Sequence, residues 1–356
     1  MITTGIFPPD IGGPATYVPR FGDFLSSNGF KVEIVTLSEK MATNSSHFPF
    51  SVQRIKRSRR RSLRMIITVA SIAKKLKTAD YLFCNGLYLE TALAMRLSFF
   101  NGHSLVKIVG DPVWERARNR GREKISVFGR IERRLITWSL EQFDRVTCPG
   151  ENLARVVKSW SSKISVNVIH NGVHIFEQRT DNSKKYDLVV ISRLVPWKNV
   201  DAVISIAKEL NCTLVVIGDG PERESLQNQA LGNTNISFLG TCTTEEIESL
   251  LAQSRVFCQL SDYEGLSFSL LQAMSSGLPC VLSDIEANRA VFNSDQDAAI
   301  FLQTGNHQHN LEEVSKILGS PELQKNMGIR AQEIVKRYFD ERERMKEMME
   351  LLAKYD

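Results

Sequence analysis

The chain has 356 residues, of which 42% are hydrophobic and 24% are charged. This length is enough for about two domains of roughly 150 residues each, and the composition excludes a collagen, a coiled coil and a disordered tail. The longest apolar run, residues 65–73, is about half of the ~20 residues that a membrane-spanning helix needs. The N-terminal segment has no cationic stretch and reaches Pro8 and Pro9 early, which argues against a signal peptide.

The net charge of +5 conceals a strong difference between the two halves of the chain. Residues 1–170 carry 27 Lys and Arg against 13 Asp and Glu, a net of +14, whereas residues 171–356 carry 18 against 27, a net of −9. Opposite signs indicate two domains with different partners, and the basic half is expected to meet an anionic one.

The cysteines give no sign of a disulfide framework or a metal site. There are six, none in a Cys-x-x-Cys pair, and most lie inside apolar runs: Cys84, Cys148, Cys212, Cys242, Cys258 and Cys280. The sequence therefore predicts buried free thiols in a reducing compartment, the cytoplasm.

Short β-branched, apolar runs alternate with longer amphipathic stretches along the whole chain. After a strand of a few residues before Gly5, the runs in the first half are residues 33–37, 81–84, 105–109, 145–148 and 166–169. In the second half they are residues 187–192, 213–217, 236–239, 256–260, 280–283 and 299–302. Strands that are apolar on both faces and separated by helices are typical of parallel sheets covered by helices. The sequence thus predicts two doubly wound α/β sheets.

The boundary between the two sheets is predicted at Asn171 and Gly172. Asn-Gly is also a common hairpin turn, but here it follows a strand at mid-chain, where the sign of the charge changes. The predicted domains are residues 1–170 and 171–336. A helix is expected over residues 337–355 and to pack back onto the first domain, because apolar residues recur there at helical spacing: Met345, Met348, Met349, Leu352 and Tyr355.

Two adjacent glycines, Gly12 and Gly13, follow the first predicted strand and precede a helix expected to begin near Ala15. Glycine lets a backbone approach a ligand closely, and a helix N-terminus offers free N–H groups to an anion. This pattern is compatible with contact to a phosphate, although a generic surface loop has the same composition.

A pair of cations follows the first strand of the second half. Arg193 comes directly after the predicted strand 187–192, and Lys198 stands five residues later, before a helix expected near Val200. Such a pair can hold a diphosphate, because ligands of open α/β sheets bind at the carboxyl ends of the strands. A solvated loop with two surface cations is the alternative.

A glycine turn, Gly218-Asp219-Gly220, ends the next strand, and Pro221 opens a helix. Further on, Glu264 and Gly265 stand where another helix is expected to begin, which places Gln272 about 12 Å along it.

Glu264 and Gln272 could then contact opposite ends of a nucleotide sugar. The N–H groups of Gly265, Leu266 and Ser267 would face its diphosphate. The alternative is an ordinary acidic first turn.

In the order and spacing of these elements the chain resembles the retaining glycosyltransferases of family four, which have the GT-B fold. The resemblance covers most of the chain and is clearest in the second half. It implies two Rossmann-like doubly wound domains facing a central cleft, with the acceptor bound by the first and the donor by the second. It further implies that Arg193 and Lys198 hold the diphosphate of the donor and stabilise the leaving group, and that Glu264 contacts the sugar hydroxyls. The residues expected at the donor are Gly12, Gly13, Arg193, Lys198, Gly218, Gly220, Glu264, Gly265, Leu266, Ser267 and Gln272.

Two positions depart from the family pattern. The family usually has a second Glu where Gln272 stands, and Gln loses the charge-assisted part of a bond to the ribose. Many members have a His after the fourth strand of the first domain, where this chain reads Gly110-Asp111-Pro112-Val113-Trp114-Glu115 and resembles a variant found in some members. Asp111 is then the best candidate to touch the acceptor hydroxyl, the alternative being a turn acid before proline.

No metal or other cofactor is expected. Asp295-Gln296-Asp297 has the Asp-x-Asp form of metal-dependent glycosyltransferases of another fold, but it stands in a polar stretch far from the phosphate elements. His307 with His309, and His170 with His174, lack further ligands. Cations and helix termini can stabilise a leaving diphosphate in place of a metal.

A basic stretch in the first half has seven cations in eleven residues: Arg54, Lys56, Arg57, Arg59, Arg60, Arg61 and Arg64. A second belt runs over residues 116–134. Cations beside an amphipathic helix suit an anionic membrane surface, and a solvated loop before a buried helix is the alternative. Nucleic acid is not expected, because no aromatic residue interleaves with the cations.

The sequence therefore predicts a retaining glycosyltransferase on the cytoplasmic side that moves a hexose from a nucleotide diphosphate sugar to a hydroxyl acceptor. The acceptor could be lipid-linked, as in surface polysaccharide or glycolipid assembly, with the enzyme peripheral on the membrane. Two alternatives stay open: a nucleotide-sugar 2-epimerase of the same fold, and a non-catalytic nucleotide-sugar binding protein, which Gln272 makes conceivable.

Overall fold

The computed structural model describes residues 1–10, 12–39, 45, 47–122, 124–175, 184–303 and 305–353. The chain divides into two compact units. The first comprises Met1–Ala117, Lys124–His170 and Arg344–Asp356, and the second comprises Arg118–Glu123 and Asn171–Glu343. The main crossing falls between His170 and Asn171, and the chain belongs to the first unit again from Arg344 onward.

The first unit is built on a seven-stranded parallel sheet with the order β3-β2-β1-β4-β5-β6-β7. Its strands are β1 (Ile2–Thr4), β2 (Glu33–Ser38), β3 (Ser51–Lys56), β4 (Tyr81–Asn85), β5 (His103–Lys107), β6 (Arg145–Cys148) and β7 (Val166–Val168). The chain starts in the middle of the sheet and winds outward in both directions. This order is that of a doubly wound fold, whose ligands bind beyond the carboxyl ends of the strands.

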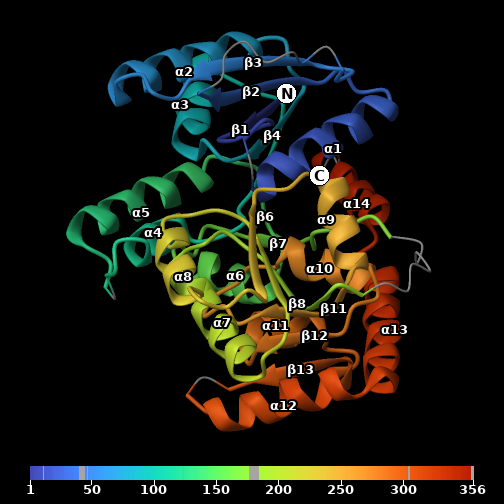
Figure 1. Ribbon diagram of the computed structural model, residues 1–356. Coiled ribbons are helices and arrows are strands. Elements are labelled where there is room, and N and C mark those ends of the chain that lie inside the picture. Colours follow the sequence, from blue (N-terminus) through green and yellow to red (C-terminus); the bar gives the residue numbers. More distant parts are fainter. Residues whose placement is uncertain are drawn as a thin grey trace. The chain divides into compact units, whose positions relative to one another are not determined.

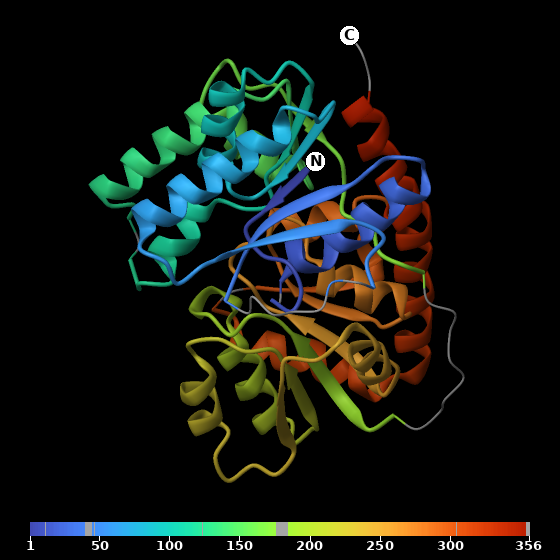
Figure 2. The ribbon, with the colours of Figure 1, turned by 90° about the horizontal axis from the view of Figure 1, so that it is seen from above.

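Helices cover both faces of this sheet (Figures 1 and 2). They are α1 (Gly13–Ser27), α2 (Arg61–Leu76), α3 (Tyr88–Ser98), α4 (Pro112–Arg118), α5 (Val127–Leu140), α6 (Glu151–Lys158) and the greater part of α14 (Glu341–Ala353). On one face, Val106 of β5 packs in a cluster with residues of α2, α3, α5 and α6. On the other face, the Phe83 ring contacts the rings of Tyr17 and Phe21 from α1.

The second unit has a six-stranded parallel sheet with the order β10-β9-β8-β11-β12-β13. Its strands are β8 (Tyr186–Ile191), β9 (Leu214–Ile217), β10 (Ile236–Gly240), β11 (Ser254–Gln259), β12 (Cys280–Ser283) and β13 (Ala299–Leu302). Its helices are α7 (Val200–Glu209), α8 (Arg223–Gln229), α9 (Thr244–Ala252), α10 (Phe268–Ser275), α11 (Glu286–Val291), α12 (His307–Gly319) and α13 (Pro321–Tyr338), with short 3₁₀ turns η1 (Pro196–Lys198) and η2 (Gln296–Ala298). Buried clusters lie on both faces of the sheet.

The predicted fold class, two parallel α/β sheets of the doubly wound kind, is confirmed. All eleven predicted strand runs are present, with ends that differ by at most two residues. The strand β3 was not predicted. It lies at the edge of its sheet and is mostly exposed or half-buried, so it lacks the apolar run that marks a buried strand.

The expectation of one continuous helix over residues 337–355 is wrong. α13 ends at Tyr338, and α14 begins at Glu341. Between them the backbone N–H of Val173 donates to the Phe339 carbonyl at 2.9 Å, and Asp340 forms a β-bridge with Val173. A contact with a segment far away in sequence therefore interrupts the helical period. Met345, Met348 and Leu352 are buried as expected, and Tyr355 lies outside the described residues.

The cysteines follow the sequence prediction. All six cysteines are free, and five of them are buried. In the described part of the chain, no helix has both the length and the apolar character needed to cross a membrane.

Candidate active site

The loop after β8 holds Arg193 against an aromatic ring. Arg193 is exposed, and its guanidinium carbon lies 5.7 Å from the centre of the Trp197 ring. Trp197 is buried, together with Leu194 and Val195 of the same loop. Since a guanidinium is attracted to the face of an indole ring, the buried tryptophan keeps the cation at the carboxyl end of the strand.

Two of the predicted site residues, Lys198 and Glu264, contact each other directly. The Lys198 ammonium forms an ion pair with the Glu264 carboxylate across 66 positions of sequence. The side chains are only 18% and 9% exposed. Because β8 and β11 are neighbours in the sheet, the loops that follow them meet at one edge and bring the two charges together.

The same two loops are also joined through hydrogen bonds. The Asp262 N–H donates to the Trp197 carbonyl at 2.8 Å. The Asn199 side-chain amide donates to the Leu260 carbonyl at 2.9 Å and to an Asp262 carboxylate oxygen at 2.6 Å. Asn199 adopts a left-handed conformation with φ 46°. Lys198 and Glu264 thus lie on two loops that hydrogen bonds hold together. The sequence carried no signal for this role of Asn199.

The glycine turn after β9 packs against the loop that carries Arg193. A Cβ atom on Gly218 would lie 1.8 Å from the Ser192 carbonyl oxygen, and one on Gly220 would lie 2.2 Å from the Leu194 carbonyl oxygen. Real atoms cannot approach so closely. Both glycines are therefore needed for the close contact between the loops, and Gly218 also has a φ of 132°.

The segment from Gly265 to Gln272 differs from the expectation in one respect. The helix α10 begins at Phe268 rather than near Gly265, with Ser267 as its N-cap. The Ser267 hydroxyl accepts from the Leu270 N–H and donates to the Gln259 side chain at 2.6 Å.

Gly265 and Leu266 thus precede the helix, and Gln272 lies half-buried in its second turn. The helix begins later than predicted because Ser267 is its N-cap. Serine is preferred at that position, where its hydroxyl accepts a hydrogen bond from the N–H three residues further on.

In the first unit, Gly12 and Gly13 mark the start of α1, slightly before the predicted Ala15. Gly12 has a φ of 143°, and its carbonyl accepts from the Thr16 N–H at 3.1 Å. A Cβ atom there would lie 2.9 Å from the Ile6 side chain. The loop after β1 therefore ends in a helix N-terminus, as the sequence indicated.

Asp111 is buried at the carboxyl end of β5 and already has several partners. Its carboxylate accepts from the N–H groups of Val113 and Trp114 at 3.1 and 3.0 Å, which caps α4. Its other oxygen forms an ion pair with Arg133 of α5. The acid predicted for the acceptor is thus a helix cap held by a cation, which the sequence around it did not reveal.

A row of buried polar groups at the carboxyl ends of neighbouring strands was missed in the sequence. Asn85 and Lys107 end the adjacent strands β4 and β5, and Thr147, the last residue but one of β6, is paired in register with Lys107. Among the described residues, the Lys107 amine, both amide atoms of Asn85 and the Thr147 hydroxyl have no hydrogen-bond partner. The Lys107 nitrogen lies 3.8 Å from the centre of the Tyr17 ring. Burial lowers the pKa of Lys107 to about 7, and the nearby Cys148 opposes that shift.

The cations of the basic stretch do not all face solvent. Arg57 forms an ion pair with Asp10 at 2.6 Å and donates to the carbonyls of Gly5 and Leu37. The Arg64 guanidinium donates to the Arg57 carbonyl at 2.7 Å.

Arg54 likewise turns inward, over the Phe7 ring. Exposed cations remain at Lys56, Arg59, Arg60 and Arg61. Some cations of the stretch therefore contact the protein, and the others face solvent from strand β3 and from the start of α2.

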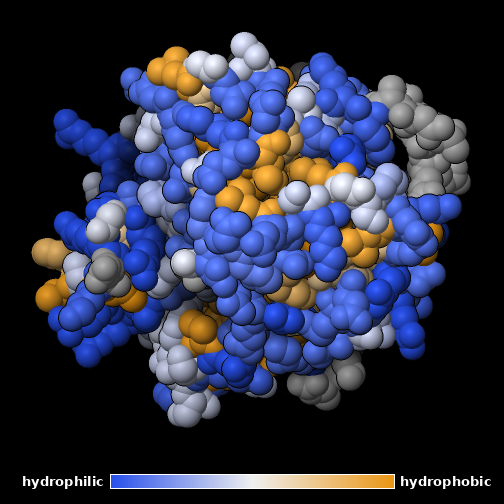
Figure 3. Space-filling view, turned by 60° about the horizontal axis from the view of Figure 1, so that its bottom comes forward, coloured by the Kyte–Doolittle hydropathy of each residue, from blue (hydrophilic) through white to orange (hydrophobic). Residues whose placement is uncertain are grey.

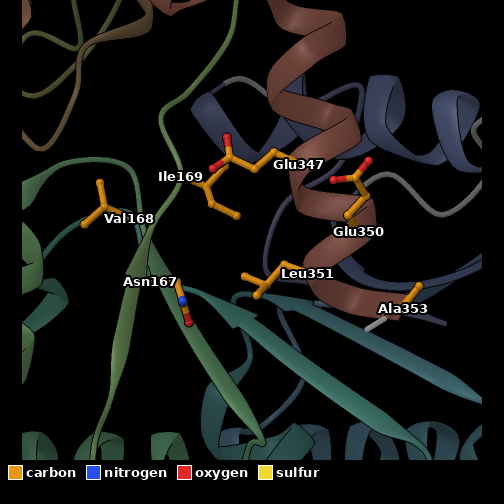
Figure 4. A pocket seen from close by; sticks show the side chains of 7 residues that line it. All are labelled: Asn167, Val168, Ile169, Glu347, Glu350, Leu351 and Ala353. Carbon is orange, nitrogen blue, oxygen red and sulfur yellow. The ribbon is translucent and has the colours of Figure 1, made fainter. Parts of the chain in front are cut away.

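A cavity of about 600 Å³ in the first unit contains none of the predicted site residues. It lies between β7 and α14, with Asn167 on the strand and the carboxylates of Glu347 and Glu350 extending from the helix (Figure 4). It is lined by Asn167, Val168, Ile169, Glu347, Glu350, Leu351 and Ala353.

The described residues contain no cluster of three or more potential metal ligands. Asp295 is engaged by Arg330 in a two-pronged ion pair, and Asp297 lies 3.8 Å from the same guanidinium. His307 contacts Glu209 at 2.7 Å, and His170 contacts the Pro149 carbonyl at 2.8 Å.

Two family models match the chain and meet at the boundary between its units. One, described as Glycosyltransferase Family 4, matches residues 11–175, and the other, Glycosyl transferases group 1, matches residues 174–334. The fold and the cationic loop after β8 therefore define a class: the chain belongs to the family-4 type of glycosyltransferases, with the GT-B pair of sheets.

Two individual relatives share less than a third of their residues with this chain over the matched regions. N-acetyl-alpha-D-glucosaminyl L-malate synthase of Bacillus anthracis is 28% identical over 225 residues, which cover 58% of each chain. One human protein, a component of phosphatidylinositol N-acetylglucosaminyltransferase, is 22% identical over 306 residues, 79% of this chain and 60% of its own. The chain thus spans about three-fifths of the length of these relatives.

The fold has a close match among solved structures. HepE of Anabaena, crystallised with UDP and glucose, superimposes with a TM-score of 0.79 at 16% identity over 99% of both chains.

Proposed function

We propose that the protein transfers a hexose from a nucleotide diphosphate sugar to a hydroxyl acceptor with retention of the anomeric configuration. One observation carries this proposal: Arg193, Lys198 and Glu264 stand together at the carboxyl ends of β8 and β11, on loops fastened to each other. Two cations and one carboxylate at the ligand-binding edge of a doubly wound sheet suit a diphosphate next to a sugar.

The two cations would bind the diphosphate and stabilise the charge that develops on it as the sugar leaves. Arg193 has a planar fork that suits two phosphate oxygens, whereas Lys198 acts as a point charge. Their positions are held before any ligand arrives, by the Trp197 ring and by Glu264. Preorganised charge of this kind is usually the largest single contribution to catalysis.

Glu264 would orient the sugar through its hydroxyl groups. Its carboxylate is nearly buried and has Lys198 beside it, so it stays at one place and accepts hydrogen bonds from a polyol. Gln272, in the second turn of α10, would contact the ribose with a neutral amide, which forms weaker bonds than a carboxylate.

We propose that the reaction needs no metal ion, because the two cations supply the charge stabilisation. Retention is proposed from the family-4 resemblance. The donor class is supported by HepE, whose crystals contain UDP and glucose.

A lipid-linked acceptor on the cytoplasmic face of a membrane is also proposed. Phosphatidylinositol stands in the name of one relative, and six free thiols suit a reducing compartment.

The test has two stages. Thermal melting with uridine, guanosine and adenosine diphosphate sugars identifies the donor, because a ligand that binds only the folded state raises the melting temperature. The products formed with that donor are then analysed with and without an acceptor alcohol.

We expect an α-linked glycoside from an α-linked donor only when the alcohol is present. An epimerised sugar formed with the donor alone would replace transfer by 2-epimerisation. Donor binding without any product would mean a non-catalytic binding protein.

A further inference from the structure

Large apolar side chains are exposed on two helices of the first unit, α2 and α5. On α5, Val127, Phe128, Ile131 and Leu135 are 60%, 84%, 50% and 45% exposed. On α2, Ile66 is 66% exposed and Leu63 is 48% exposed. A helix that packs on a sheet needs one apolar face, so the second apolar face of these helices is not explained by the fold.

The exposed residues of α5 form a single stripe. Val127, Ile131 and Leu135 are spaced by four and therefore share a face, with Phe128 beside them. Ile136 and Leu140, on the inner side, are buried in the core of the unit. Where α4 and α5 project at the left of Figure 3, apolar atoms in orange lie beside hydrophilic atoms in blue. The stripe thus faces outward along the helix.

The beginnings of α2 and α5 lie at the same edge of the sheet. α2 starts directly after β3, and α5 runs back to the start of β6, so both helices begin near the carboxyl ends of the parallel strands. α3 packs against both of them (Figure 1). With about 8–10 Å between the axes of packed helices, the axes of α2 and α5 lie at most roughly 16–20 Å apart.

Cations border these apolar residues. Arg59, Arg60 and Arg61 are exposed at the start of α2, and Arg130 and Arg134 are exposed on α5 beside the stripe. The acid of α5, Glu132, forms an ion pair with Arg116 at 2.9 Å. An apolar surface with a cationic border suits an anionic bilayer, because the rings and chains enter the interface while the cations meet the headgroups.

We propose that the beginnings of α2 and α5 form a docking surface for an anionic lipid bilayer, with Phe128, Ile131 and Ile66 as the inserted residues. The opposite side of α5 carries Arg133, which holds Asp111. Docking would therefore place the bilayer on the helix that positions the acid proposed for the acceptor. The inference deepens the proposed function, but binding to lipid is measurable without any sugar transfer.

The test compares two substitutions that each replace an exposed apolar side chain with glutamate. Phe128→Glu adds a negative charge on α5, and Leu231→Glu adds one at a site that is 73% exposed in the second unit. Sedimentation is measured with phosphatidylcholine vesicles that contain about 30% phosphatidylglycerol, at low salt and at about 0.5 M salt, where screening is strong.

We expect the parent protein and Leu231→Glu to bind alike, and Phe128→Glu to bind at least about tenfold more weakly, since a charge is costly in the apolar interface. Arg130→Gln with Arg134→Gln should weaken binding at low salt and change it little at high salt. Transfer to a soluble acceptor should be equal in all variants, which separates failure of docking from failure of the proposed activity.

Three results would overturn the proposal. One is a parent protein that does not bind anionic vesicles at low salt. Another is equal binding by Phe128→Glu and Leu231→Glu. The third is a parent that forms dimers in solution, binds no vesicles and becomes monomeric with Phe128→Glu, which would assign the surface to a second copy of the chain.

Discussion

The residues at the carboxyl ends of the strands have different contacts in the two sheets. In the second unit, the loops after β8, β9 and β11 are joined to one another by the Lys198–Glu264 ion pair, by Asn199 and by the close packing of Gly218. In the first unit, Asp111 caps a helix and pairs with Arg133, and the buried side-chain amine of Lys107 has no hydrogen-bond partner among the described residues.

This difference suits a division in which the second unit binds the donor diphosphate and the first unit binds the acceptor hydroxyl. A site for a highly charged diphosphate benefits from charges that are already in position, because no reorganisation is then needed during the reaction. A site for a neutral hydroxyl needs less charge, so its residues can also serve the stability of the fold. The predictions below test this division, from the largest expected effect to the smallest.

Removing the cations of the second unit should have the largest effect. We expect Arg193→Ala and Lys198→Ala each to lower turnover by about 100-fold or more, because loss of one such group typically costs about 3–4 kcal/mol in the transition state. Lys316→Ala, which removes an exposed lysine of the same unit, should have normal turnover. Steady-state kinetics with the identified donor give the comparison, and near-normal rates in both site variants would refute the assignment.

A methyl group in the glycine turn should disturb the site through its neighbour. In Gly220→Ala the new Cβ atom would meet the Leu194 carbonyl oxygen at 2.2 Å, whereas Gly319→Ala meets nothing within 4 Å. We expect Gly220→Ala to lose about 1–3 kcal/mol of stability, as overpacked positions do, and roughly tenfold of activity. Denaturant unfolding and kinetics of both variants check this, and equal behaviour would mean that the loops separate freely.

Substitution of Asp111 can separate its structural part from its proposed contact with the acceptor. Asn at this position can still accept from the N–H groups of Val113 and Trp114, while Ala cannot. We expect Asp111→Ala to lose about 1–2 kcal/mol of stability and Asp111→Asn to lose less. If Asp111 touches the acceptor, Asp111→Asn should lower turnover several-fold with unchanged binding of the donor. Unchanged turnover would leave Asp111 a helix cap only.

Lys107 should make stability depend on pH. Its pKa is about 7 in the folded protein, because it is buried, and 10.5 when exposed. Between these values the unfolded chain binds the proton and the folded chain does not, so stability should rise as the pH increases from 7 to 10.5.

We expect Lys107→Met to remove this rise and to raise the melting temperature near pH 7 by a few degrees. Lys74→Met, at an exposed lysine of the same unit, should keep it. Melting curves measured over that pH range decide, and a rise of the same slope in Lys107→Met would contradict the assignment.

The smallest effect is expected from chelation. If Arg193 and Lys198 supply the charge stabilisation, EDTA should change the rate by less than about twofold. Complete loss of activity, restored by Mg²⁺ or Mn²⁺, would instead indicate a metal-dependent reaction. It would also require Asp295 to leave Arg330.

The sequence carried more information on the buried parts than on the edges. Buried parallel strands such as 280–283 and 299–302 were predicted to the residue, because both of their faces are apolar. The edge strand β3 has no such signal, since only Ile55 of its six residues is buried and its cations belong to the basic stretch. The family resemblance then placed Arg193, Lys198 and Glu264 in one site, and the ion pair of the last two agrees with that placement.

By itself the sequence determined the fold class, the buried strands of both sheets and the cations that follow β8, because these depend on local apolar runs and on short spacings. Only the tertiary structure decided which partners the charges take. Asp111 meets Arg133, and Arg57 meets Asp10, across 22 and 47 positions of sequence. It also decided where the last helix begins, through the bridge between Val173 and Asp340. Such contacts arise only when distant segments are packed together, and no local pattern encodes them.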